Sequence, residues 1–153
     1  DTAYKTKFCI GVAGYPEKHF EAPNMKTDFG FLKKKVEMGA EFIVTQMFFD
    51  NSKYVEFVAL CRENGINVPI IPGLKPITSS KQLISLPKIF HIDLPEELSE
   101  AVQKCKSEKE VREVGIEHMI AQCKELMKVG APVLHFYTMS NPGPTKRIAE
   151  AIF

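Results

Sequence analysis

Four short runs of apolar and β-branched residues constrain the fold of this chain more than any other feature of its sequence. They lie at 8–14, 42–46, 68–73 and 133–137. Apolar residues fill these runs almost continuously, whereas a strand with one solvated face alternates apolar and polar residues. The runs therefore predict buried strands of a parallel sheet, with helices in the crossovers between them.

The segments between these runs carry the signals of helices. Ser107 and Glu110 have the spacing of a capping box, which predicts the start of a long helix. Pro87 is expected to end an earlier helix, because a proline inside a helix removes a backbone hydrogen bond. The expected helices span 27–39, 51–65, 78–86, 95–105, 107–130 and 144–152. The chain is thus expected to form one α/β domain in which a strand followed by a helix occurs four times.

Composition argues against several classes of protein. The 153 residues carry a formal net charge of +1, and 44% are hydrophobic, as in one globular domain. Balanced charge argues against a nucleic-acid partner, and no apolar run approaches the roughly 20 residues that a membrane span requires. The four cysteines form no C-x-x-C pair, so we expect neither a disulfide framework nor a metal site. With no signal-peptide pattern, we expect a cytoplasmic protein that binds a small molecule.

Four strand–helix units fit either a small open sheet or half of an eight-unit barrel. An open nucleotide-binding sheet usually carries a glycine-rich phosphate loop after its first strand, and this sequence has none. Polar or conformationally special residues end each apolar run instead, at Gly14-Tyr15-Pro16-Glu17, Thr45-Gln46, Pro72-Gly73 and Tyr137-Thr138. Barrel enzymes build their active sites from such strand ends, so the pattern favours a barrel.

The residues at these strand ends resemble those of the methylenetetrahydrofolate reductase family. The matching motifs are Ala13-Gly14-Tyr15-Pro16-Glu17-Lys18-His19, Leu32-Lys33-Lys34-Lys35-Val36, Gly39-Ala40, Thr45-Gln46-Met47-Phe48-Phe49-Asp50, Ile71-Pro72-Gly73, Lys81-Gln82 and His135-Phe136-Tyr137-Thr138. The family's catalytic domain is a TIM (βα)8 barrel, a fold that typically takes about 250 residues. The resemblance implies that residues 1–153 form the second half of such a barrel, with four βα units, and that the N-terminal half is absent.

The resemblance also implies an activity. Members of the family reduce 5,10-methylenetetrahydrofolate to 5-methyltetrahydrofolate, with FAD as cofactor and NADH or NADPH as hydride donor, and so supply methyl groups for methionine. The family's glutamate proton donor belongs to the absent half, so no catalytic residue is expected in this chain. We expect a homo-oligomer. Two alternatives stay open: a non-catalytic half-barrel that binds flavin or a partner chain, and an unrelated small domain of flavodoxin-like strand order.

The family pattern implies that flavin contacts come from the loop and helix after the first strand. The implied residues are Tyr15, His19, Ala22, Asp28, Lys34 and Lys35. Tyr15 offers a flat apolar face with a polar tip, and a lysine ammonium is a point charge that meets phosphate well. Without the resemblance, the run 33–35 would be interpreted as a solvated helix face.

Three further residues resemble the family's substrate contacts: Gln46, Gln82 and Tyr137. From the sequence alone, a satisfied core glutamine is an equal alternative for Gln46, and a buried structural tyrosine is an equal alternative for Tyr137. For Gln82 the sequence alone favours an exposed helix position. After Tyr137-Thr138 the family often continues with Leu-Asn-Arg, whose arginine contacts the folate. This chain has Met139-Ser140-Asn141 there, and its next cations are Lys146 and Arg147.

The remaining histidines and aromatic residues are interpreted as structural. His118 is expected on a helix surface. His135 is expected inside a strand, either as a hydrogen-bonded core residue or as a residue that supports a neighbouring site residue. Phe48 and Phe49 are expected in the core.

Overall fold

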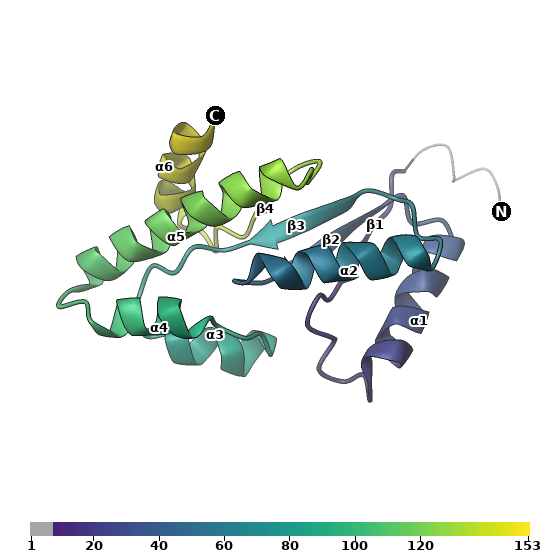
Figure 1. Ribbon diagram of the computed structural model, residues 1–153, viewed down its shortest axis with the longest axis horizontal. Helices are drawn as coiled ribbons and strands as arrows, with labels where there is room; N and C mark the ends of the chain where they lie inside the picture. Colours follow the sequence, from purple (N-terminus) through teal and green to yellow (C-terminus); the bar gives the residue numbers. More distant parts are fainter. Residues whose placement is uncertain (1–7) are drawn as a thin grey trace.

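A computed structural model describes residues 8–153 and shows one parallel sheet with helices between its strands (Figure 1). The strands are β1 (Gly11–Gly14), β2 (Phe42–Met47), β3 (Ile70–Leu74) and β4 (His135–Phe136). The helices are α1 (Met25–Glu37), α2 (Asn51–Glu63), α3 (Gln82–Phe90), α4 (Glu96–Gln103), α5 (Glu108–Lys128) and α6 (Pro142–Ile152). Each strand expected from the sequence is present, and the expected α/β class is confirmed.

The order of the strands in the sheet is the order in the chain, β1-β2-β3-β4, and all three pairings are parallel. Val12 pairs with Ile43, which in turn pairs with Ile70. Every crossover therefore moves one strand further in the same direction, as in a βα barrel, whereas a doubly wound sheet reverses direction. The flavodoxin-like alternative is wrong for this reason.

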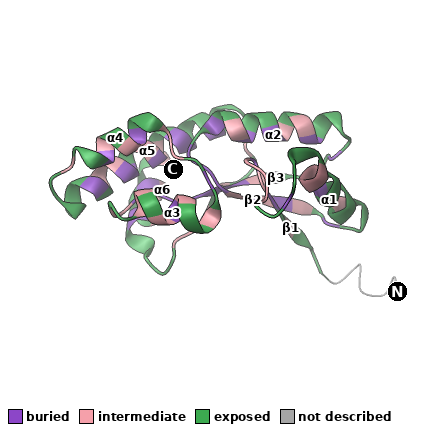
Figure 2. Cartoon of the chain, turned by 90° about the horizontal axis from the view of Figure 1, so that it is seen from below, coloured by how far each residue is buried: buried purple, intermediate pink, exposed green. Residues whose placement is uncertain are grey.

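The two faces of the sheet differ in how they are covered. Along β2, buried residues alternate with half-buried ones, and the buried Ile43 packs in a cluster with residues of α1, α2, α5 and α6. Buried and exposed positions also alternate along α2 and α5 (Figure 2). Val44 and Gln46 point to the opposite face, because successive strand residues alternate sides. Helices α1, α2, α5 and α6 therefore cover the face of Ile43 more fully than the face of Gln46.

A second apolar cluster lies beyond the sheet, under α3 and α4. It joins Met47 and Phe49 to Leu86, Leu98 and Val102 on these two short helices. Phe48 and Phe49 are both buried, as expected. The cluster attaches the inserted helices to the carboxyl end of β2 and so shapes that edge of the sheet.

Three details differ from the sequence-based expectations. Helix α3 continues through Pro87 to Phe90, because Leu86 is buried in the second cluster and the His91 amide donates to the Pro87 carbonyl at 2.9 Å. His135 is exposed at the sheet edge, where its ring packs edge-on against Tyr137 at 4.9 Å, so the core interpretation was wrong. His118 is half-buried rather than on the open helix surface, and burial lowers its pKa.

β2, β3 and β4 meet closely at Thr45. The Gly73 amide donates to the Thr45 hydroxyl at 2.9 Å, and the Tyr137 hydroxyl donates to the Thr45 carbonyl at 2.9 Å. A Cβ atom on Gly73 would overlap that carbonyl oxygen and press on the Tyr137 ring. Only glycine allows the two backbones to approach this closely.

We expect Gly73→Ala to destabilise the full-length protein by about 1 to 3 kcal/mol, because the methyl group forces β2 and β3 apart. Gly30→Ala is the matched control, because Gly30 lies in α1 and no atom lies within 4 Å of the place where its Cβ would be. Alanine there should raise the free energy of unfolding by about 0.5 to 1 kcal/mol. Urea unfolding of both variants measures the difference. Equal stabilities would contradict the close approach at Thr45.

Candidate functional site

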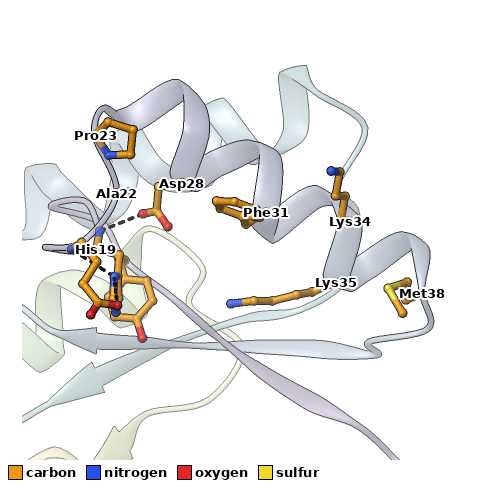
Figure 3. A pocket seen from close by; sticks show the side chains of 10 residues that line it. His19, Ala22, Pro23, Asp28, Phe31, Lys34, Lys35 and Met38 are labelled. Atoms are coloured by element: carbon orange, nitrogen blue, oxygen red, sulfur yellow. Dashed lines mark hydrogen bonds and ion pairs between the residues drawn. The ribbon is translucent and has the colours of Figure 1, made fainter.

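A pocket of about 500 Å³ lies between α1 and the loop that joins it to β1 (Figure 3). Its size falls in the range of small-molecule and cofactor sites, about 300 to 1,000 Å³. The lining residues are Tyr15, His19, Glu21, Ala22, Pro23, Asp28, Phe31, Lys34, Lys35 and Met38. The pocket opens at the carboxyl end of β1, where a barrel protein carries its site.

Hydrogen bonds shape the loop after β1. Lys18 has a positive φ of 75°, and its ammonium donates to the carbonyls of His19 at 2.9 Å and Ala22 at 2.7 Å. The His19 amide donates to the Asp28 carboxylate at 2.8 Å, and the Asn24 side chain caps α1 by accepting from the Thr27 amide. These contacts tie the loop to the first turn of α1, so the pocket wall is built before any ligand arrives.

Tyr15 and His19 form the end of the pocket nearest the sheet. Their rings meet edge to face, with centroids 4.6 Å apart. Burial raises the pKa of Tyr15, and the nearby charge of Asp28 raises it further. The phenol therefore stays neutral at physiological pH and presents a hydrogen-bond donor beside an aromatic surface.

Helix α1 supplies the long wall of the pocket. Phe31, Lys34, Lys35 and Met38 follow one another along its pocket face, and Lys35 extends toward the loop that carries His19 (Figure 3). The Lys35 ammonium lies 3.4 Å from the Ala13 carbonyl, and the Lys34 ammonium lies 5.9 Å from the centre of the Phe31 ring. The two ammonium groups therefore lie at different places along the pocket, one near the Phe31 ring and one near the end of β1.

This one pocket is lined by all six residues that the family pattern implies as flavin contacts. Their role stays a prediction, but the chain brings them together across a loop and a helix. Sequence reasoning missed Phe31 and Met38. Their signal was present, because positions 31, 34, 35 and 38 share the i, i+3, i+4, i+7 spacing of one helix face.

The three implied substrate residues do not share a single pocket. Gln46 is half-buried at a shallow crevice beside Glu17 and His91, and its side-chain oxygen accepts from the Met47 amide at 3.0 Å. Gln82 and Tyr137 line a second pocket, of about 220 Å³, at the carboxyl ends of β3 and β4. All three therefore lie near the carboxyl ends of the strands, Gln46 in one place and Gln82 with Tyr137 in another.

Glu17 is a feature of this edge that the sequence did not single out. Both of its carboxylate oxygens accept from the Asp93 amide, at 3.3 and 3.4 Å. Burial raises the pKa of Glu17 to about 7, against the opposing effect of that hydrogen bond. The ring of Phe20 stacks on His91 at 4.4 Å. The loop after β1 thus rests on the loop between α3 and α4.

Among residues 8–153, no group of three or more histidine, cysteine or acidic side chains is arranged to hold a metal ion. Within the same residues, every helix is too short or too polar to cross a bilayer.

The strand order and the pocket together define half of a βα barrel with a candidate ligand site at the carboxyl ends of its strands. A family model described as methylenetetrahydrofolate reductase matches residues 2–152. The chain belongs to the methylenetetrahydrofolate reductase family.

Individual relatives agree with this assignment. Methylenetetrahydrofolate reductase 1 of Schizosaccharomyces pombe is 39% identical over 152 residues, which cover 99% of this chain and 25% of that protein. A probable methylenetetrahydrofolate reductase (NADPH) of Caenorhabditis elegans is 36% identical, with coverages of 97% and 23%. The 5,10-methylenetetrahydrofolate reductase of Buchnera aphidicola is 35% identical, with coverages of 87% and 46%. The chain thus spans less than half the length of each of these relatives.

A solved structure from Clostridium thermocellum has the same fold. It is described as binding two copies of 5-methyl-5,6,7,8-tetrahydrofolic acid. The match has a TM-score of 0.60 and 19% sequence identity, and it covers 94% of this chain and 52% of that one. The four βα units correspond to about half of that protein.

We expect Glu17→Gln to stabilise the protein at neutral and higher pH and to leave it unchanged in acid. The pKa of the Glu17 carboxyl is 4.5 in the unfolded chain and about 7 in the folded protein. Because the folded state holds this proton more tightly, the wild type loses stability as the pH rises between these two values. The variant should be more stable by about 1 to 2 kcal/mol at pH 8, after allowance for partial solvent screening.

Chemical denaturation from pH 4 to pH 8 measures this effect. Glu63→Gln changes the charge equally at an exposed position on α2 and should show no such trend. A constant difference between Glu17→Gln and wild type across the range would contradict the burial of the carboxylate.

Proposed function

We propose that the full-length protein reduces 5,10-methylenetetrahydrofolate to 5-methyltetrahydrofolate, with FAD as cofactor and NADH or NADPH as hydride donor. The observation that carries this proposal is the gathering of all six implied flavin residues in one pocket of a family member. Relatives named for NADPH and for NADH support a nicotinamide donor without choosing between the two. The folate ligand of the Clostridium thermocellum protein supports a folate as substrate.

The chemistry of the pocket fits a flavin dinucleotide. Ala22, Pro23, Phe31 and Met38 provide apolar wall, and Lys34 and Lys35 add two ammonium groups to the lining. A dinucleotide combines a flat aromatic ring with a pyrophosphate, and lysine is suited to phosphate as a point charge. Apolar and aromatic walls together with cations are what such a ligand requires.

The residues of this chain bind and orient in the proposed reaction. FAD, when bound, supplies the hydride transfer, because no protein side chain can carry a hydride. Tyr15 and His19 would contact the flavin, and Lys34 and Lys35 would hold its anionic part. Gln46 lies on the less covered face of the sheet, where its amide could hydrogen-bond the folate and the nicotinamide in turn.

We also propose that four further βα units complete the barrel over the uncovered face of the sheet. Ala13 and Ile10 are exposed on or beside the edge strand β1, and Val44 and Ile71 are only half-buried although all four are apolar. An apolar sheet face and an unpaired edge strand both call for a covering element. The greater length of the relatives supports such a unit, which would also hold the glutamate proton donor. A homo-oligomeric state and a cytoplasmic location stay predictions.

We expect Lys35→Glu to raise the dissociation constant for FAD at least tenfold in the full-length apoprotein, with a loss that shrinks at high salt. The substitution places a negative charge where the pocket would hold phosphate. Lys33→Glu is the matched control, because Lys33 is the exposed neighbour on α1 that does not line the pocket. Fluorescence titration of FAD at low and high salt measures both. Equal affinities for Lys35→Glu, Lys33→Glu and wild type would rule out the pocket as the flavin site.

A further inference from the structure

The second pocket contains a buried cation. Lys75 follows β3 directly and is only 5% exposed, yet it lines the 220 Å³ pocket at the ends of β3 and β4. No hydrogen bond or ion pair of its ammonium is found among residues 8–153, and burial alone lowers its pKa. The stem of the side chain is buried and its ammonium belongs to the pocket lining, so the pocket is where a counter-charge would bind.

The other groups around Lys75 are neutral hydrogen-bonding groups. The ten residues that line the pocket include no aspartate and no glutamate. The Gln82 side-chain oxygen accepts from the Thr78 amide at 2.7 Å, which fixes the orientation of the amide and leaves its NH2 group as a donor. The Thr145 hydroxyl is buried and has no partner within the described part of the chain. The pocket therefore offers an ammonium, an amide NH2 group and a hydroxyl as donors, and its lining carries no anionic side chain.

The two cations that follow Tyr137-Thr138 in the sequence, Lys146 and Arg147, do not line this pocket. The Arg147 guanidinium donates to both carboxylate oxygens of Glu113, each at 2.7 Å, and the Lys146 ammonium lies 3.7 Å from the Glu150 carboxylate. Both pairs lie on the exposed side of α6. Lys75 is thus the cation that lines this pocket, and it comes from β3 rather than from the segment after β4.

We propose that Lys75, with the Gln82 amide and the Thr145 hydroxyl, forms an anion-binding subsite for a carboxylate or phosphate group of the ligand that occupies the barrel mouth. The identity of that ligand rests on the proposed function. A folate carries carboxylates on its glutamate tail, and a nicotinamide dinucleotide carries phosphates. An anion seated there would supply the counter-charge that Lys75 lacks and accept hydrogen bonds from both neighbours.

The test uses Lys75→Met in the full-length protein, with calorimetric titration of three ligands. These are 5-methyltetrahydrofolate, its pteroamide analogue, in which a simple carboxamide replaces the glutamate, and NADH. If the anion is the tail carboxylate, the dissociation constant for 5-methyltetrahydrofolate rises at least tenfold and that for the pteroamide analogue changes less than twofold. If it is a nucleotide phosphate, the affinity for NADH falls instead. Unchanged affinities for all three ligands would overturn the proposal.

Lys146→Met is the matched control, because it removes the same charge from the outer face of α6 and should leave all three affinities unchanged. Lys75→Met should also fold, with a melting temperature about 2 to 4 °C higher, since it removes an uncompensated buried charge. A lower melting temperature would show that the ammonium already has a stabilising partner, and would overturn the proposal.

A second measurement separates this proposal from the proposed function. In wild-type protein labelled with ε-13C lysine, the Lys75 resonance, assigned by its loss in Lys75→Met, should shift on addition of glutarate or inorganic phosphate. The Lys146 resonance should not shift. This result would support the anion site even if the protein bound no folate, whereas the absence of a shift with either anion would contradict it.

Discussion

Thr45 is the residue on which the carboxyl edge of the sheet depends. It is fully buried. Its hydroxyl accepts a hydrogen bond from the Gly73 amide, and its carbonyl accepts one from the Tyr137 hydroxyl. One residue of β2 thereby fixes the ends of β3 and β4. The next residue, Gln46, must point to the opposite face because of the strand period. The packing at Thr45 therefore sets where the polar residues at the ends of β2, β3 and β4 are presented.

This arrangement explains how one short chain offers two separate pockets along one edge. Parallel strands in chain order bring all their carboxyl ends together, and the loops that follow are free to differ. The loop after β1 folds back on α1 through Asp28 and forms the larger pocket. The loops after β3 and β4 enclose the smaller pocket around Lys75. Glu17 and Phe20 connect the first loop to the segment between α3 and α4.

The strands and most helix boundaries could be predicted from the sequence, because they follow from local patterns. The six residues that the family resemblance implies for a flavin lie in one pocket, and their role stays a prediction. The failures of the sequence-based expectations have a common physical origin. The passage of α3 through Pro87, the exposure of His135 and the burial of His118 all depend on which distant elements pack together. Lys75 and Glu17 are unusual only because of burial, which a single sequence does not record. By contrast, Phe31 and Met38 followed from helix spacing and could have been found.

We propose that these four βα units are half of a reductase barrel whose cofactor lies along α1. A crystal structure of the full-length protein with FAD and 5-methyltetrahydrofolate tests this proposal most directly. We expect flavin density between the loop after β1 and the Lys34–Lys35 face of α1, with further parallel strands paired to the outer edges of β1 and β4. Flavin bound elsewhere, or outer edges of β1 and β4 left unpaired by the rest of the chain, would contradict it.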